Sequence, residues 1–289
     1  MYRATLLLLA FLQAPAAPAR DFSGEHAMQL TRQAVAFGAR PIGSPALRRL
    51  QAFITASLKA DGCQVSIDSF TGQTPNGPVP MHNVICRFPG SSGKAIAITG
   101  HYDTKILPRF VGANDGGSST GLLLELARAL QGAPRKDDVL LVFFDGEEAV
   151  KDWTATDSLY GSRHLADRWQ ADGTLAKLKA LINVDMIGDK DLELVYDMGS
   201  SAQVRTLVWD AADALGYSRN FPRAQGGITD DHMPFLQHGV KAVDLIDFNY
   251  GPGNAYWHTP QDTLDKLAPH SFEVVGRVVL ESIRRLEAQ

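Results

Sequence analysis

Residues 138–144 read DVLLVFF, and the chain continues at once with Asp145, Gly146, Glu147 and Glu148. An unbroken apolar run of this length is typical of a strand that is covered on both faces, as in a parallel sheet. The polar residues that follow mark the carboxyl end of the strand, where open α/β sheets bind their ligands. This stretch predicts both a buried central strand and a functional edge of the sheet.

Apolar stretches that predict strands and are followed by polar residues recur along the chain. Further strands are predicted at 64–70, 82–88, 94–99, 180–184 and 241–246, the first two forming an antiparallel hairpin joined by a Pro/Gly-rich loop at 71–80. Helical spacing of apolar residues predicts helices at 23–38, 44–60, 116–130, 158–169, 202–215, 231–238 and 271–286. Strands that alternate with helices predict an α/β fold, a three-layer α/β/α sandwich around a mixed, mostly parallel central sheet. No linker or repeat interrupts the pattern, so we expect one catalytic domain over residues 20–289.

Composition and the first residues narrow the class of protein. The 289 residues are 45% hydrophobic and 21% charged, with a net charge of −4, which disfavours disorder and offers no broad basic surface for nucleic acid. Arg3, a largely apolar run at 4–12 and small residues in an A-x-A pattern predict a signal peptide over 1–19. The run is shorter than the ~20 apolar residues of a membrane span, so we expect an exported protein, periplasmic or secreted, without a membrane anchor. No apolar stripe demands a partner, and a monomer is the default expectation.

The only two cysteines are Cys63, directly before the first strand of the predicted hairpin, and Cys86, in its second strand, and both lie near its open end. Export to an oxidising compartment makes a disulfide between them plausible. Two small buried thiols are the alternative, because sequence does not show whether the side chains meet.

Ligand-type side chains gather where the predicted strands end. They are His101, Asp103, Asp145, Glu147, Glu148, Asp185 and His258, with Asp115 at the start of a helix. Each has a structural explanation by itself, and Asp115 could simply cap its helix. Taken together at one sheet edge, the imidazoles and carboxylates predict a metal site that suits Zn²⁺. A phosphate loop is excluded because 116–119 lacks the Walker lysine.

Longer motifs carry a family resemblance across about residues 25–286. They are 101–105 (HYDTK), 110–115 (FVGAND), 143–149 (FFDGEEA), Trp153, 157–166 (DSLYGSRHLA), 230–235 (DDHMPF) and 256–259 (YWHT). The chain resembles the zinc aminopeptidase clan, and within it the animal-type glutaminyl-peptide cyclotransferases, or glutaminyl cyclases. The ten-residue segment 157–166 is the most specific of these motifs.

The resemblance implies an activity and a role for each matching residue. The activity is conversion of an N-terminal glutaminyl residue of a peptide or protein to pyroglutamate, with release of ammonia. One zinc ion is expected, with two possible. The implied roles are zinc ligation by Asp115, Glu148 and His258, acid/base catalysis by Glu147, hydrogen bonding to Glu147 by Asp185 and Asp230, and pocket walls formed by Trp153 and Trp257.

Two segments, 114–117 and 183–188, look more like the aminopeptidases of the clan, and Gly100 stands where the cyclases tend to carry a cysteine. In two-metal aminopeptidases, the positions of His101 and Asp185 ligate a second ion. A secreted two-zinc aminopeptidase that hydrolyses N-terminal residues therefore remains the alternative. A metal-free binding domain is disfavoured, because every acidic residue of the expected site is present.

Overall fold

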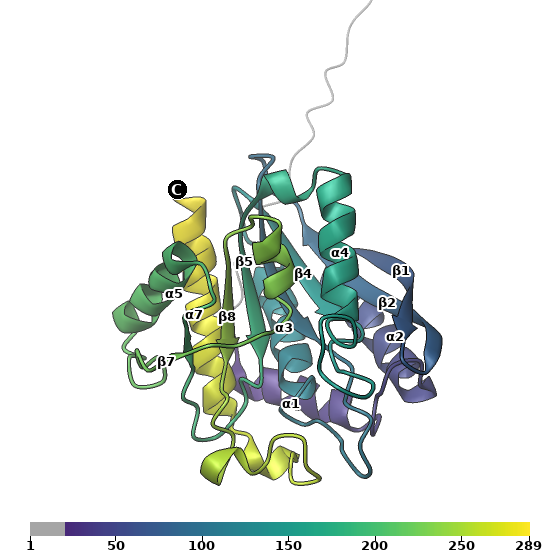
Figure 1. The fold of residues 1–289 in the computed structure, drawn as a ribbon. Helices are drawn as coiled ribbons and strands as arrows, with labels where there is room; N and C mark the ends of the chain where they lie inside the picture. The colour runs from purple at the N-terminus through teal and green to yellow at the C-terminus, as the bar shows by residue number, and fades with distance from the viewer. Residues whose placement is uncertain (1–20) are drawn as a thin grey trace, which may run out of the picture.

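The computed structural model describes residues 21–289, so the predicted signal peptide at 1–19 lies outside the described residues. A six-stranded mixed sheet, ordered β1-β2-β4-β3-β5-β8, forms its centre (Figure 1). Its strands are β1 (Gln64–Thr74), β2 (Gly77–Phe88), β3 (Ala95–His101), β4 (Asp138–Phe144), β5 (Leu178–Asp185) and β8 (Ala242–Ile246). The last four are parallel to one another, whereas β2 is antiparallel to both β1 and β4.

Helices cover both faces of this sheet (Figure 1). They are α1 (Gly24–Val35), α2 (Pro45–Ala60), α3 (Gly117–Leu130), α4 (Tyr160–Ala171), α5 (Ala202–Ala214), α6 (Met233–Gln237) and α7 (Pro269–Glu287). Short 3-10 helices occupy Leu175–Lys177, Pro252–Asn254 and Leu264–Lys266, and β6 (Tyr196–Asp197) pairs with β7 (Gln225–Gly226) in a small second sheet.

Strand β4 shows why the apolar run at 138–144 requires two helical layers. Alternate side chains of a strand point to opposite faces of the sheet. Val139, Leu141 and Phe143 belong to the core cluster that contains residues of α1, α2, α3, α5 and α7, whereas the intervening side chains belong to the cluster that contains residues of α4 and α6. The predicted three-layer α/β/α sandwich with a mostly parallel sheet is therefore confirmed.

One local expectation was wrong. The segment 71–80 is not a loop, because β1 and β2 pair continuously from Gln64↔Arg87 to Thr74↔Gly77. Pro78 and Pro80 are tolerated because β4 pairs only with the far end of β2, from residue 84 onward. The proline-containing half of β2 thus has an open edge, where the missing N–H of a proline costs no hydrogen bond between strands.

The two cysteines form a disulfide that joins the start of β1 to β2. The Cα atoms of Cys63 and Cys86 lie 5.7 Å apart, and the S–S distance is 2.05 Å. Of the two arrangements considered from the sequence, the disulfide is the one that the structure contains.

Within residues 21–289, no helix combines the length and the apolar character needed to cross a bilayer.

We predict that the Cys63–Cys86 disulfide stabilises the folded state measurably. It closes a loop with a sequence separation of 23 residues, and a loop of this size corresponds to roughly 3 kcal/mol of unfolding free energy. Urea unfolding with and without a reductant should show this difference. The double variant Cys63→Ala/Cys86→Ala is the control and should not respond to the reductant. An unchanged urea midpoint in the reduced wild-type protein would contradict the prediction.

Candidate active site

The candidate site lies at the carboxyl ends of the parallel strands. His101 is the last residue of β3, Asp185 is the last residue of β5, and Glu147 and Glu148 follow the end of β4. The other ligand-type residues come from connections: Asp115 directly precedes the turn into α3, and His258 lies between β8 and α7. The fold therefore collects these side chains from five segments that are distant in sequence, two of them strand ends and three of them connections.

Three of them form a cluster that fits a metal ion. His258 Nε2 lies 3.2 Å from Asp115 Oδ2 and 3.3 Å from Glu148 Oε1, and the three residues offer ligand atoms that all lie within 4.8 Å of one another. Both carboxylate oxygens are buried, and apart from these contacts with His258 they have no polar partner in the described part of the chain. Buried anionic oxygens are normally paired or bound to metal. One imidazole and two carboxylates are ligands that Zn²⁺ accepts, so these residues fit a zinc ion.

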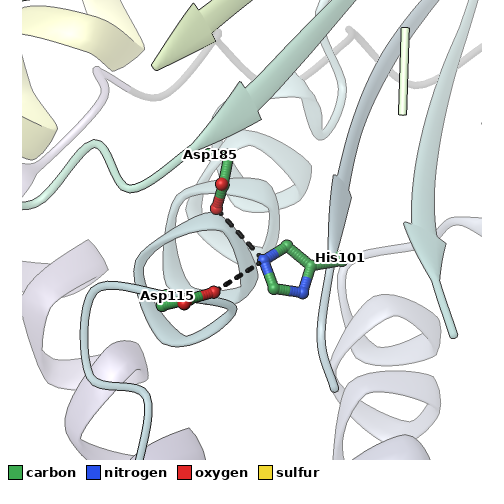
Figure 2. Close-up of side chains that lie close together, drawn as sticks. All are labelled: His101, Asp115 and Asp185. Carbon is green, nitrogen blue, oxygen red and sulfur yellow. Dashed lines mark hydrogen bonds and ion pairs between the residues drawn. The ribbon is translucent and has the colours of Figure 1, made fainter. Parts of the chain in front are cut away.

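A second cluster shares one of those residues. Figure 2 shows His101 between Asp115 and Asp185, with its Nε2 atom 3.2 Å from Asp115 Oδ1 and 3.1 Å from Asp185 Oδ1. As in the first cluster, each carboxylate oxygen faces the imidazole nitrogen, and here Asp185 Oδ1 is also hydrogen-bonded to it. On the other side of the ring, His101 Nδ1 lies 3.4 Å from Asp103 Oδ1. The structure thus brings together the residues expected for a second metal, with His101 itself bridging the acids.

The charges of the first cluster shift the pKa values of its members. Burial lowers the pKa of His258, but the hydrogen bonds and charges of Asp115 and Glu148 together outweigh this effect and raise it to about 9. Burial and the charge of Asp115 raise the pKa of Glu148. Without an ion, the site therefore holds a proton on His258, which a metal ion must displace.

Glu147 lies beside this cluster and is almost fully buried. Its backbone N–H donates to Asp103 Oδ1 at 3.1 Å, and the N–H of Glu148 donates to Asp103 Oδ2 at 3.4 Å. Burial, together with the charges of Glu148 and Asp230, raises the pKa of Glu147 well above its usual range, although His101 opposes the shift. Asp103 thus fixes the backbone from which the expected acid/base and one expected ligand both project.

Asp185 and Asp230 share a cavity with Glu147. The hydrogen bonds that the structure gives them go elsewhere: Asp185 bonds to His101, and Asp230 accepts from the backbone N–H of Asp231. Burial and the charge of Asp185 raise the pKa of Asp230 to about 6. Their expected hydrogen bonding to Glu147 therefore stays a prediction, whereas their proximity to it is a feature of the structure.

The cavity has a volume of about 240 Å³, below the roughly 300–1,000 Å³ of pockets for drug-sized ligands. It is lined by Asp115, Glu147, Glu148, Trp153, Asp185, Gly227, Ile228, Thr229, Asp230, Ile246, Phe248, Trp257 and His258. The acidic groups come from the ends of β4 and β5 and from the loop residues Asp115 and Asp230, whereas the apolar groups come from loops and from the end of β8. This arrangement suits a small polar group that is bound between apolar walls.

Both expected tryptophans line the cavity. Trp257 stacks on His258 with the ring centroids 4.0 Å apart, and Phe248 packs edge-on against Trp257 at 4.9 Å. Trp153 is 43% exposed, although it is a large apolar side chain. An exposed tryptophan at the mouth of a cavity is a feature of binding sites rather than of a packed core.

The loop that carries Trp153 is held by Asp157. Its carboxylate accepts the backbone N–H groups of Val150, Lys151 and Asp152 at 2.8, 2.9 and 3.0 Å. The phenol of Tyr160 donates to the same carboxylate at 2.7 Å. The segment 157–166, which carried the most specific resemblance, thus fixes a pocket wall.

Several site residues were missed from the sequence. Ile228 and Phe248 line the cavity, and the carboxylate of Asp262 accepts the backbone N–H groups of Asn114 and Asp115 at 2.8 and 3.2 Å. Asp103 was recognised only as a strand-end acid, without its contacts to the backbone of Glu147 and Glu148. Nothing in the local sequence distinguishes Ile228, Phe248 or Asp262 from ordinary loop residues.

Comparison with known proteins agrees with this geometry. The family model of peptidase family M28 matches residues 83–283. A mouse glutaminyl-peptide cyclotransferase-like protein is 32% identical, over 83% of this chain and 70% of its own. The crystal structure of an Acidobacteriales bacterium glutaminyl cyclase is 42% identical and superposes with a TM-score of 0.90, covering 96% of this chain and 99% of that one.

A Zn-dependent exopeptidase from Parabacteroides distasonis is also similar in structure, with 26% identity and a TM-score of 0.82 over 92% of this chain and 99% of that one. The fold is therefore common to cyclases and exopeptidases, whereas the sequence is more similar to the two cyclase-type relatives. The chain belongs to peptidase family M28 and, within it, to the glutaminyl-peptide cyclotransferases.

Proposed function

We infer that this protein is a zinc-dependent glutaminyl cyclase, which converts the N-terminal glutaminyl residue of peptides to pyroglutamate and releases ammonia. The observation that carries this proposal is the small cavity that is lined by buried Asp115 and Glu148, partly buried His258, Glu147, and the two tryptophans Trp153 and Trp257. The cavity has room for one side chain. The proteins to which this chain is similar are named for this reaction.

The reaction is an intramolecular acyl transfer. The α-amine nitrogen of the substrate attacks its own side-chain amide carbon, a C–N bond closes the five-membered ring, and the bond to the departing ammonia breaks. Because both reacting groups belong to one residue, most of the entropic cost is removed once the side chain is held in the folded-back conformation. The main tasks of the protein are therefore to hold that conformation and to move one proton.

Asp115, Glu148 and His258 would hold the zinc ion, which supplies a Lewis acid that polarises the carbonyl of the side-chain amide. Glu147 accepts the proton that the α-amine loses and donates it to the departing ammonia. Asp230 and Asp185, in the same cavity, add negative charge that favours the protonated form of Glu147. We assign these three acids to catalysis on that basis.

The aromatic walls orient the substrate and exclude water. The flat, uncharged amide of glutamine fits between the rings of Trp153 and Trp257, where a charged side chain would lose its hydration without gaining a partner. Exclusion of water matters because hydrolysis of the amide to glutamate competes with ring closure. We therefore assign both tryptophans to substrate binding.

We also propose that residues 20–289 form one catalytic domain that is exported after removal of 1–19. The disulfide Cys63–Cys86 supports export, because such bonds persist in oxidising compartments and are rare in the cytosol.

The decisive test of the function is a comparison of two substrates on one zinc-loaded preparation. With a Gln-initiated dipeptide we expect release of ammonia and formation of the pyroglutamyl product, detected by mass spectrometry. With a leucine arylamide we expect no release of the arylamine. Cleavage of the leucine substrate without cyclisation of the glutaminyl one would mean that the chain is an aminopeptidase instead.

Glu147→Gln should lower kcat by about 10²- to 10⁴-fold while zinc content is retained, since the amide keeps the size of the side chain but accepts no proton. Glu148→Gln is the matched control, because it changes the adjacent residue in the same way and should instead lose zinc. If Glu147→Gln turns over substrate about as fast as the wild type, the acid/base assignment is wrong.

We expect one zinc ion per chain, bound by the first cluster. The support is that Asp115 Oδ2 and Glu148 Oε1 form no hydrogen bond within the described residues and contact only His258, whereas Asp185 Oδ1 is hydrogen-bonded to His101. Elemental analysis after dialysis should give one zinc in the wild type and in Asp185→Asn, and none in Glu148→Gln. A value of two that falls to one in Asp185→Asn would show that the His101 cluster binds metal as well.

A further inference from the structure

Arg40 is fully buried and contacts the loop that ends in Asp115. Its backbone N–H donates to Thr104 Oγ1 at 2.9 Å, and its carbonyl oxygen accepts the N–H of Thr104 at 3.1 Å. Its guanidinium extends to the other end of the loop, where it donates to the carbonyl oxygens of Val111 at 2.7 Å and Gly112 at 2.9 Å. Arg40 therefore fastens both ends of the loop 104–112, which connects β3 to the segment carrying Asp115.

The same segment is bound from its other side by Asp262. The Asp262 carboxylate accepts the N–H groups of Asn114 and Asp115, and Tyr250 donates its phenol to the carboxylate at 2.8 Å. Arg40 thus binds carbonyl groups, and Asp262 binds the N–H groups that follow within three residues. The backbone leading to Asp115 therefore has buried side-chain partners for both its acceptors and its donors.

Close packing leaves this segment no alternative position. Gly112 has a positive φ of 51°, and a Cβ atom there would lie 2.4 Å from the carbonyl oxygen of Asp115. The guanidinium of Arg40 lies 3.5 Å from the same position. The backbone turn that presents Asp115 is therefore formed by contacts in which only glycine fits.

A fully buried guanidinium is a costly way to stabilise a fold. Burial lowers the pKa of Arg40 to about 10, although the charges of Asp262, Asp103 and Asp115 oppose the shift, so the side chain is charged at neutral pH. Apolar residues of similar volume often stabilise a bare fold as well as or better than a buried ionic cluster. The charged side chain is therefore better explained by the backbone it positions than by stability alone.

We propose that Arg40 and Asp262 are positioning residues that hold the backbone of Val111–Asp115 so that the Asp115 carboxylate faces Glu148 and His258, and that they thereby set the affinity of the site for zinc. The inference rests on the zinc site proposed above. Neither residue lines the cavity. Their effect on the metal is transmitted through hydrogen bonds to the backbone, of the kind that commonly changes metal affinity by about 10- to 100-fold.

The test measures zinc affinity directly, by competition with a chromogenic chelator of known Kd. Arg40→Met removes the hydrogen bonds to the loop and should raise the Kd for zinc about 10- to 100-fold. Asp262→Asn keeps the size of the side chain and should weaken zinc binding in the same direction, and it carries the test if Arg40→Met does not fold. Substitution with Co²⁺ gives a second readout, since the visible spectrum of the bound ion should change in both variants.

Arg205 provides a matched control. It is also a buried arginine that donates to carbonyl oxygens, those of Asp197 at 2.5 Å and Ser200 at 3.4 Å, but it lies at α5 and does not contact the loop 104–115. Arg205→Met should lower the melting temperature without changing the Kd for zinc or the Co²⁺ spectrum.

The outcomes separate the two proposals. A wild-type protein that binds no zinc would overturn the proposed zinc centre and this inference with it. A wild-type protein that binds zinc and cyclises glutaminyl peptides, beside Arg40→Met and Asp262→Asn proteins with the same zinc Kd, would overturn the positioning role alone. An equal loss of zinc affinity in Arg205→Met would also overturn it, because the effect would then be one of general destabilisation.

Discussion

Mutual repulsion among buried carboxylates is the constraint on which the rest of this structure depends. Asp115 and Glu148 both lie against His258, and Asp185 and Glu147 lie close by, all of them buried. Such a group is stable only where each charge is neutralised by a proton, a cation or several hydrogen-bond donors. The surroundings supply these. Lys105 lies 3.3 Å from Glu148, and His101 lies between Asp115 and Asp185.

Backbone N–H groups neutralise two further buried carboxylates, those of Asp103 and Asp262. Asp103 and Asp262 accept pairs of consecutive N–H groups, those of Glu147 with Glu148 and of Asn114 with Asp115. These two carboxylates thus fix the backbone segments that carry Glu147, Glu148 and Asp115. The acidic character of the site extends well beyond the residues that face the cavity, which explains why so many acidic residues follow the strand ends.

The features that the sequence predicted are those that leave a pattern in neighbouring residues. The apolar run at 138–144 indicated a strand buried on both faces, and polar residues after it and after its neighbours indicated the functional edge. His101, Asp115, Glu148, Asp185 and His258 do come together there. Arg40 and Asp262 were not predictable, because their partners are backbone groups distant in the chain that no side-chain pattern reveals. The stretch 71–80 was wrongly predicted to be a loop because its prolines and glycines favour turns. Whether a strand tolerates these residues depends on whether its edge is open, which the local sequence does not show.

The environments of the four tryptophans differ sharply. Trp209 and Trp169 are buried in the core, Trp257 is partly covered by Phe248 and His258, and Trp153 is open to solvent on a loop fixed by Asp157. Indole emission depends on exposure to water, so the signal of Trp153 is distinguishable from the buried background. Trp153 and Trp257 both line the cavity, so a ligand bound there would change the surroundings of both rings. The protein therefore carries a built-in optical reporter of pocket occupancy, which makes binding observable without a label and separately from turnover.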